Sequence, residues 1–90
     1  MAIVRVIDER VLGRNKLAFD EHAILRMNER GVTEDQVVES LKSPDTTGLR
    51  ADPGRHRVRK SYPANVSIDV IYEEDPTQIV VVSVMRNVKK

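Results

Sequence analysis

The sequence predicts an α+β domain in which two N-terminal helices pack on one face of an antiparallel β-sheet. Val and Ile together number 20 against 5 Leu, and this ratio favours strands as the larger part of the fold. Helix-capping residues bracket two short segments between positions 20 and 44. Three runs rich in Val and Ile then occupy residues 55–86. A chain of 90 residues is expected to form one domain, residues 1–90.

A short strand is predicted at the start of the chain. Residues 3–7 form an apolar run around Arg5, and the acidic and basic residues 8–10 end it. Residues 13–16, which begin with Gly13, are expected to form a loop before the first helix. The expected order of elements is therefore one strand, two helices and three further strands.

The two helices are predicted from their ends. Asp20 is a plausible N-cap for a helix over about residues 21–30, and Gly31 supplies the left-handed residue that follows its last turn. Thr33 and Gln36 match a capping box for a second helix over about residues 34–42, which Pro44 stops. The apolar residues expected to face the sheet are Ala23, Ile24, Met27, Val37, Val38 and Leu41.

The rest of the chain is predicted as a loop and three strands. Residues 43–54 contain two Pro and two Gly, so they should form a loop or at most one short strand. The strands are expected at residues 55–62, 66–73 and 79–86. The turns between them, residues 63–65 and 74–77, are short enough for antiparallel hairpins.

Composition excludes several classes of function. The chain has no cysteine, and hence neither disulfides nor thiolate metal sites, which suits a cytoplasmic protein. No segment approaches the roughly 18–20 apolar residues of a membrane span, and the N-terminus lacks the features of a signal peptide. A net charge of +1 means that any binding of anions must come from a local patch.

Three potential cations lie four residues apart on the first helix. Residues four apart share one side of a helix, so His22, Arg26 and Arg30 are expected to form one stripe. Like charges at this spacing do not stabilise a helix, so the stripe must be neutralised by the fold or by an anion. One interpretation is structural, with ion pairs to Asp69, Glu73 or Asp8 or an interaction with the helix dipole. The other is an anion-binding site.

A second basic cluster lies in the strand predicted at residues 55–62. Alternation along a strand places Arg55, Arg57 and Arg59 on one side, with Val58 and Tyr62 on the other. We call the three arginines the arginine ladder. The ladder could keep an exposed edge strand soluble, or it could bind phosphates. The shortage of aromatic residues argues against base stacking.

Two helices joined by a short turn also suggest a helix-turn-helix, but charge argues against that interpretation. The second helix would enter the major groove, and its first half carries Glu34, Asp35 and Glu39 with no cation before Lys42.

The run His22-Ala-x-x-Arg26-Met27-x-x-Arg30-Gly31-Val32 resembles an uncharacterised bacterial domain family that is similar to the RelE/ParE/BrnT toxin superfamily. The resemblance includes residues 80–85 as the closing strand and implies a RelE-like core over residues 16–86, with residues 1–15 as an N-terminal extension. It implies two helices on a twisted antiparallel sheet, and a ribonuclease toxin that acts on free or ribosome-bound RNA and is neutralised by an antitoxin protein. The chain departs from the toxins in lacking their strongly basic balance and their cluster of Lys, Arg and C-terminal Tyr or His.

Metal-independent RNA cleavage needs a general base, an acid and cations that stabilise the phosphorane charge. The candidate catalytic residues in this chain are His22 as base, Arg26 and Arg30 as phosphate ligands, and His56 or Tyr62 as acid. The candidate residues for binding an anion or nucleic acid are Arg55, Arg57, Arg59 and Arg86, the last if its strand is central. His22 and His56 lie 34 positions apart and match no familiar metal-ligand spacing, so neither a metal nor a cofactor is expected.

Two functions therefore stay open at this point. The first is a RelE-like ribonuclease toxin of a toxin–antitoxin pair. The second is a non-catalytic domain on the same scaffold that binds a protein or a nucleic acid through its arginines.

Overall fold

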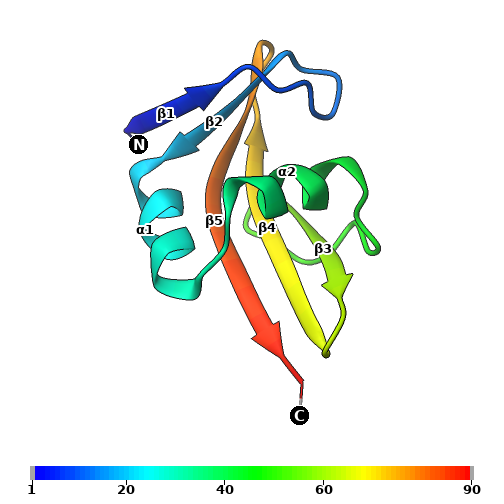
Figure 1. Ribbon diagram of the computed structural model, residues 1–90. Helices are drawn as coiled ribbons and strands as arrows, with labels where there is room; N and C mark the ends of the chain where they lie inside the picture. The colour runs from blue at the N-terminus through cyan, green and yellow to red at the C-terminus, as the bar shows by residue number, and fades with distance from the viewer. Residues whose placement is uncertain (1, 90) are drawn as a thin grey trace.

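The computed structural model describes residues 2–89, which form five strands and two helices in the order ββααβββ (Figure 1). The elements are β1 (Ile3–Ile7), β2 (Lys16–Asp20), α1 (Glu21–Arg30), α2 (Glu34–Lys42), β3 (His56–Tyr62), β4 (Val66–Glu74) and β5 (Gln78–Val88). Both helices have the predicted bounds, and β1 lies where it was expected. The three C-terminal strands lie within two residues of their predicted ends.

Strand β2 was not predicted from the sequence, in which residues 13–16 were expected to form a loop. Its residues Leu17, Ala18 and Phe19 are all fully buried, so both faces of this strand are covered. A short strand that is buried on both faces shows no alternation of apolar and polar residues, and this alternation is the signal by which strands are recognised.

The sheet has the strand order β1-β2-β5-β4-β3. Strands β3, β4 and β5 form the predicted antiparallel meander, and β1 also pairs with β2 in the antiparallel orientation. The pair β2 and β5 is parallel, so the expectation of a wholly antiparallel sheet is wrong and the sheet is mixed. A parallel pair needs a long crossover connection, which here is residues 21–77. No turn sequence next to β2 could therefore predict that it pairs with β5.

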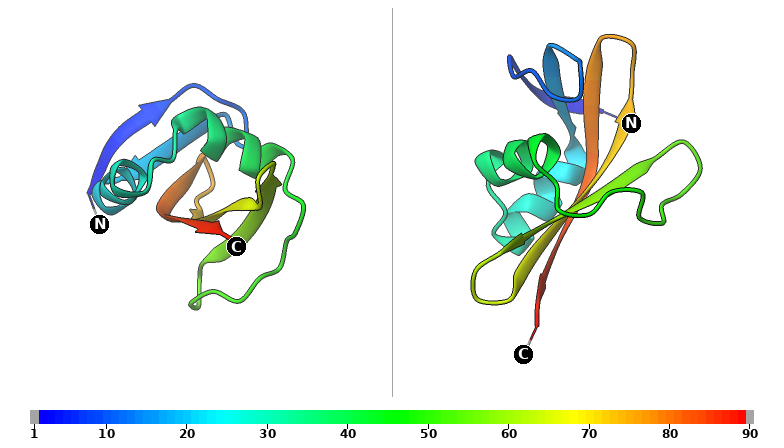
Figure 2. Two further views of the ribbon diagram at one scale, coloured as in Figure 1. Left: turned by 60° about the horizontal axis from the view of Figure 1, so that its bottom comes forward. Right: turned by 90° about the vertical axis from the view of Figure 1, so that its right-hand side faces the viewer.

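Both helices cover the same face of the sheet (Figure 1; Figure 2, right). Helix α1 packs mainly on β5, and α2 packs on β4 and β3. Val58, Val70 and Val84 point into this layer and belong to the main core. The remaining buried residues of this core are Val11 and Val32, which lie in loops, and residues of β2, α1, α2, β4 and β5. The latter are Leu17, Phe19, Ala23, Met27, Val37, Leu41, Ile68, Tyr72, Ile79 and Val81.

The opposite side of the sheet, which we call the open face, carries no helix. Where β2, β4 and β5 form this face, a small apolar cluster is present, made of Ala18, Ile71, Val80 and Val82. The pairing of β4 with β5 shifts by one residue between Ile71 and Tyr72, so Val82 has no partner in β4. This β-bulge re-aims the side chains of β5 and increases the local twist.

The ends of the helices confirm the predicted caps. The side chain of Asp20 accepts a hydrogen bond from the Ala23 N–H at 2.7 Å. Gly31 closes α1 in the left-handed conformation with φ of 65°, a conformation that side chains disfavour. At α2, the Thr33 hydroxyl accepts from the Gln36 N–H at 3.1 Å, and the Gln36 side chain accepts from the Thr33 N–H at 3.0 Å. Within residues 2–89, neither helix is long and apolar enough to cross a membrane.

We expect Thr33→Ala to lower the free energy of unfolding by about 1 kcal/mol, because the first turn of α2 loses a side-chain acceptor. Thr33→Ser keeps the oxygen and should stay close to wild type. Urea unfolding monitored by circular dichroism measures both variants. Equal midpoints for Thr33→Ala and Thr33→Ser would show that the capping box does not stabilise the protein.

Candidate functional site

The arginine ladder lies on the open face, as alternation predicted, and it meets carboxylates from the neighbouring strand β4. Arg57 Nε donates to Asp69 Oδ2 at 2.8 Å, and Arg59 donates to both oxygens of Asp69 at 2.7 and 3.0 Å. Arg55 Nε donates to Glu73 Oε2 at 3.1 Å. Three arginines therefore face two carboxylates, and the ladder keeps one unit of net positive charge.

Asp69 organises this cluster. Its side chain is fully buried, whereas the side chains of Arg57 and Arg59 remain 25% and 36% exposed. Burial acts to raise the pKa of Asp69, but the hydrogen bonds from Arg59 and Arg57 outweigh it, so the pKa lies below its ordinary value of 3.8. The carboxylate is thus held ionised between two guanidinium groups that stay open to solvent on their outer sides.

Strand β3 lies at the edge of the sheet, and the loop before it covers its outer side. The N–H groups of Asp45 and Thr46 both donate to the Arg59 carbonyl, at 2.9 and 3.1 Å, and the Arg59 N–H donates back to Thr46 at 2.9 Å. This short bridge satisfies backbone groups that an edge strand would otherwise leave unpaired. The arginine side chains are therefore not needed to protect this part of the edge.

The stripe of His22, Arg26 and Arg30 does not form one site. Arg26 pairs with Glu29 at 2.8 Å along the same helix. Arg30 reaches inward, and its Nη1 donates to the Val84 carbonyl at 2.5 Å. His22 is exposed, and no contact among residues 2–89 joins its imidazole to either arginine. These interactions favour the structural interpretation for Arg26 and Arg30, although their partners are not the carboxylates that the sequence suggested.

His56 and Tyr62 lie on the helix side of the sheet, opposite the arginine ladder. The His56 ring stacks on Tyr72, with ring centroids 5.2 Å apart. The Tyr62 ring packs against the core, and its buried hydroxyl has no hydrogen-bond partner within the described part of the chain. The predicted acid candidates are therefore separated from the arginine ladder by the sheet, and among residues 2–89 neither forms a hydrogen bond or an ion pair with His22, Arg26 or Arg30. Their roles stay predictions.

Arg86 belongs to β5, which is central, as its predicted role required. It pairs across the sheet with Ile68, a core residue on the helix side. Arg86 is exposed and does not share a face with the arginine ladder.

The pairing of Asp69 with the arginine ladder was not predicted from the sequence, which suggested Asp69 only as a possible partner for the stripe on α1. The available signal was its position as the one charged residue between Val66 and Tyr72, within a run of strand-forming residues. A carboxylate in such a run must find a partner when it is buried. Among residues 2–89, no group of three or more His, Cys, Asp or Glu side chains is placed to hold a metal.

Comparison with known proteins identifies a family for this chain. A family model described as a domain of unknown function, DUF4258, matches residues 19–86. This range covers both helices, β3, β4 and β5 as far as Arg86, and it leaves out β1 and most of β2. No curated protein and no solved structure matches the chain.

We expect the double variant Arg57→Met/Arg59→Met to lose about 3–5 kcal/mol of unfolding free energy at pH 7, because it leaves a buried carboxylate without partners. The triple variant that adds Asp69→Leu should recover most of this loss, because it removes the buried charge as well. Urea unfolding measures all three proteins. Equal stability of the double and triple variants would contradict the organising role of Asp69.

The same cluster predicts a dependence of stability on acid. The pKa of Asp69 is lowered by folding, so its contribution is fully present above its ordinary pKa of 3.8 and is lost as pH falls through the folded value. Wild type should therefore lose more stability than the triple variant below about pH 4. Thermal melts of the two proteins between neutral and acid pH measure this difference, and parallel curves would contradict it.

Proposed function

We propose that this chain, which belongs to the DUF4258 family of domains of unknown function, binds RNA through the open face of its sheet as a domain of the RelE-like toxin type. The observation that carries the proposal is the pair of guanidinium groups that share one buried carboxylate. Arg57 and Arg59 bring two positive charges to Asp69, which neutralises only one of them. The excess charge is held at a fixed place on a face that no helix covers.

Arginine suits the recognition of phosphate because its planar group presents several donors at once. In Arg59, Nε and Nη2 are used by Asp69, and this holds the guanidinium in one orientation. A guanidinium that is already ordered loses less side-chain entropy when it binds a ligand. Arg55 contributes less to this surface because Glu73 balances its charge.

Binding on this face would involve the RNA backbone rather than stacked bases. Tyr62 and Tyr72 both lie toward the helix side, and Phe19 is fully buried in the core. No aromatic ring is therefore available on the open face as a platform for a base. The net charge of +1 provides little long-range attraction, so the affinity should be modest and sensitive to salt.

Metal-independent cleavage of RNA is the second candidate function. The His22 to Val32 run resembles a domain family that is similar to the toxins, which favours this function, and an arginine close to the base is suited to stabilise a phosphorane. His22 is the candidate base because its imidazole is exposed and has no partner among residues 2–89. It lies on α1 and therefore on the helix side of the sheet, so Arg26 on the same helix is its candidate phosphate ligand. A toxin of this kind would be neutralised by an antitoxin, and an acidic segment laid over the arginine ladder would be the simplest way to do so.

We expect Arg57→Ala to weaken binding of single-stranded RNA and to reduce the slope of log affinity against log salt by about 0.7, the value for one lost phosphate contact. Arg10→Ala removes the same charge from the loop after β1, where Arg10 bonds to the Asn15 side chain, and serves as the matched control. Fluorescence anisotropy at several salt concentrations measures both, after circular dichroism has shown that each variant is folded. An equal effect of the two substitutions would contradict binding on the open face.

Cleavage is tested by His22→Ala. Removing a general base should lower the rate of RNA degradation by about 10²–10⁴-fold. The exposed imidazole contributes little to packing, so the variant should melt like wild type. Asn28→Ala on the same helix is the control. Growth after induction and degradation of purified RNA are the two measurements. Harmless expression of wild type with intact RNA would exclude the ribonuclease, and equal cleavage by wild type and His22→Ala would exclude only the role of His22.

A further inference from the structure

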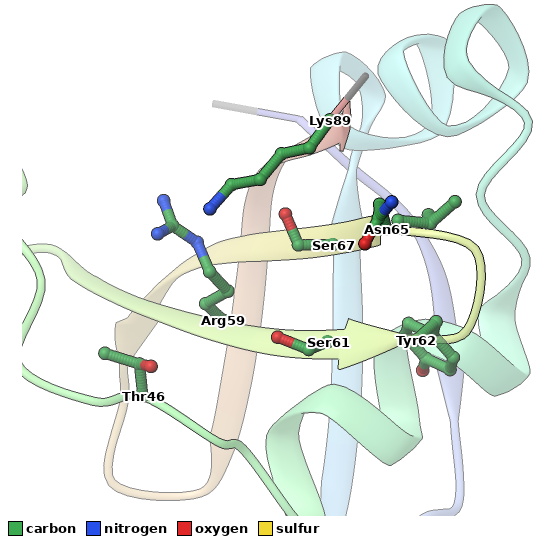
Figure 3. A pocket seen from close by; sticks show the side chains of 8 residues that line it. Thr46, Arg59, Ser61, Tyr62, Asn65, Ser67 and Lys89 are labelled. Atoms are coloured by element: carbon green, nitrogen blue, oxygen red, sulfur yellow. The ribbon is translucent and has the colours of Figure 1, made fainter.

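A pocket of about 340 Å³ opens at the end of the sheet, between the β3–β4 hairpin and the end of β5 (Figure 3). Its polar lining includes Arg59, Ser61, Asn65, Ser67 and Lys89. The side chains of Arg59 and Lys89 extend toward each other above Ser67 in Figure 3, and Tyr62 points to the other side of the hairpin. The residues of this lining therefore come from β3, from the β3–β4 turn with the start of β4, and from the segment that follows β5.

The backbone holds these segments together. Ser61 and Ser67 are direct partners in the antiparallel pair of β3 and β4, which places their side chains side by side. Ala64 and Asn65 have positive φ angles of 67° and 60°, which makes the hairpin turn tight. The Lys89 N–H donates to the Asn65 carbonyl at 2.9 Å and so fixes the end of the chain beside this turn.

Several donors in the pocket have no partner among residues 2–89. Arg59 bonds to Asp69 through Nε and Nη2, and its Nη1 is not used. The Lys89 ammonium and the hydroxyl groups of Ser61 and Ser67 also have no hydrogen-bond partner there. Asp45 does not line the pocket, and its Oδ2 accepts a hydrogen bond from the Ser61 N–H at 2.7 Å. The described residues that line the pocket therefore include two cations and no carboxylate.

We infer that this pocket binds a terminal phosphate monoester of RNA, an inference that rests on the proposed binding of RNA to the open face. Charge supports a monoester over the diester of the backbone. Arg57 and Arg59 exceed Asp69 by one positive charge, and Lys89 adds a second, which matches a phosphate monoester of charge close to −2. A monoester also presents three terminal oxygens to the four unused donor groups, whereas a diester presents two.

The inference is tested with one short RNA prepared with a 5′-phosphate, with a 3′-phosphate, or with hydroxyl groups at both ends. Wild type should bind one phosphorylated form about tenfold more tightly than the hydroxyl form, since each charge-assisted hydrogen bond contributes on this scale. Lys89→Ala and the double variant Ser61→Ala/Ser67→Ala should lose this preference. Lys42→Ala removes the same charge from α2, where Lys42 pairs with Glu9, and should keep it. The two phosphorylated forms show which end is bound.

Equal binding of all three RNAs by wild type would overturn the inference while leaving RNA binding on the open face intact. The opposite case, a phosphate site without RNA binding, is tested by titrating the protein with inorganic phosphate and following the NMR shifts of its backbone amides. Shifts at Ser61 and Ser67 that disappear in Lys89→Ala, in a protein that binds none of the RNAs, would support the phosphate site and contradict the proposed function. A phosphate preference that survives in Lys89→Ala would overturn the site.

Discussion

Strand β5 connects the two halves of the molecule, and the rest of the architecture depends on its pairing. It pairs in parallel with β2 over residues 78–81 and antiparallel with β4 along nearly its whole length. Because β2 leads directly into α1, this pairing also places α1 against β5. Helix α2 then follows on the same side, over β4 and β3. With both helices on one side, the other face of the sheet is left for side chains that have no helix above them.

The parallel pairing with β2 ends at Val81, and Arg30 contacts β5 beyond that point. Its guanidinium donates to the Val84 carbonyl, a backbone acceptor on the part of β5 that β2 does not reach. A hydrogen bond from a charged donor to a partly buried acceptor contributes about 1.5–3 kcal/mol, so this contact can join the end of α1 to the central strand. Arg30 therefore has a role in the fold that is independent of any ligand, and His22 is the member of the stripe that remains open to solvent.

The open face combines stability with a candidate function through Asp69. A buried carboxylate requires partners, and in this chain the partners are two arginines of the edge strand. The need to neutralise Asp69 orders both guanidinium groups, and an ordered pair with excess charge can receive an anion at less entropic cost. The pocket at the hairpin uses the same Arg59, so one side chain belongs both to the buried ion cluster and to the lining of the pocket.

The sequence by itself determined the features that depend on neighbours a few residues away. The caps at Asp20, Gly31 and Thr33 set the ends of both helices, and short turns made the C-terminal meander the natural arrangement of three apolar runs. Tertiary structure decided the features that need partners far along the chain. One such feature is β2, which is buried on both faces and therefore lacks the alternation of apolar and polar residues that marks a strand. Its partner β5 lies more than half the chain away in the sequence. Tertiary structure also left the face that carries the arginine ladder without a helix and chose Asp69 as the partner of the ladder. Alternation along a strand shows which residues share a face, but only the packing of the sheet decides what that face meets.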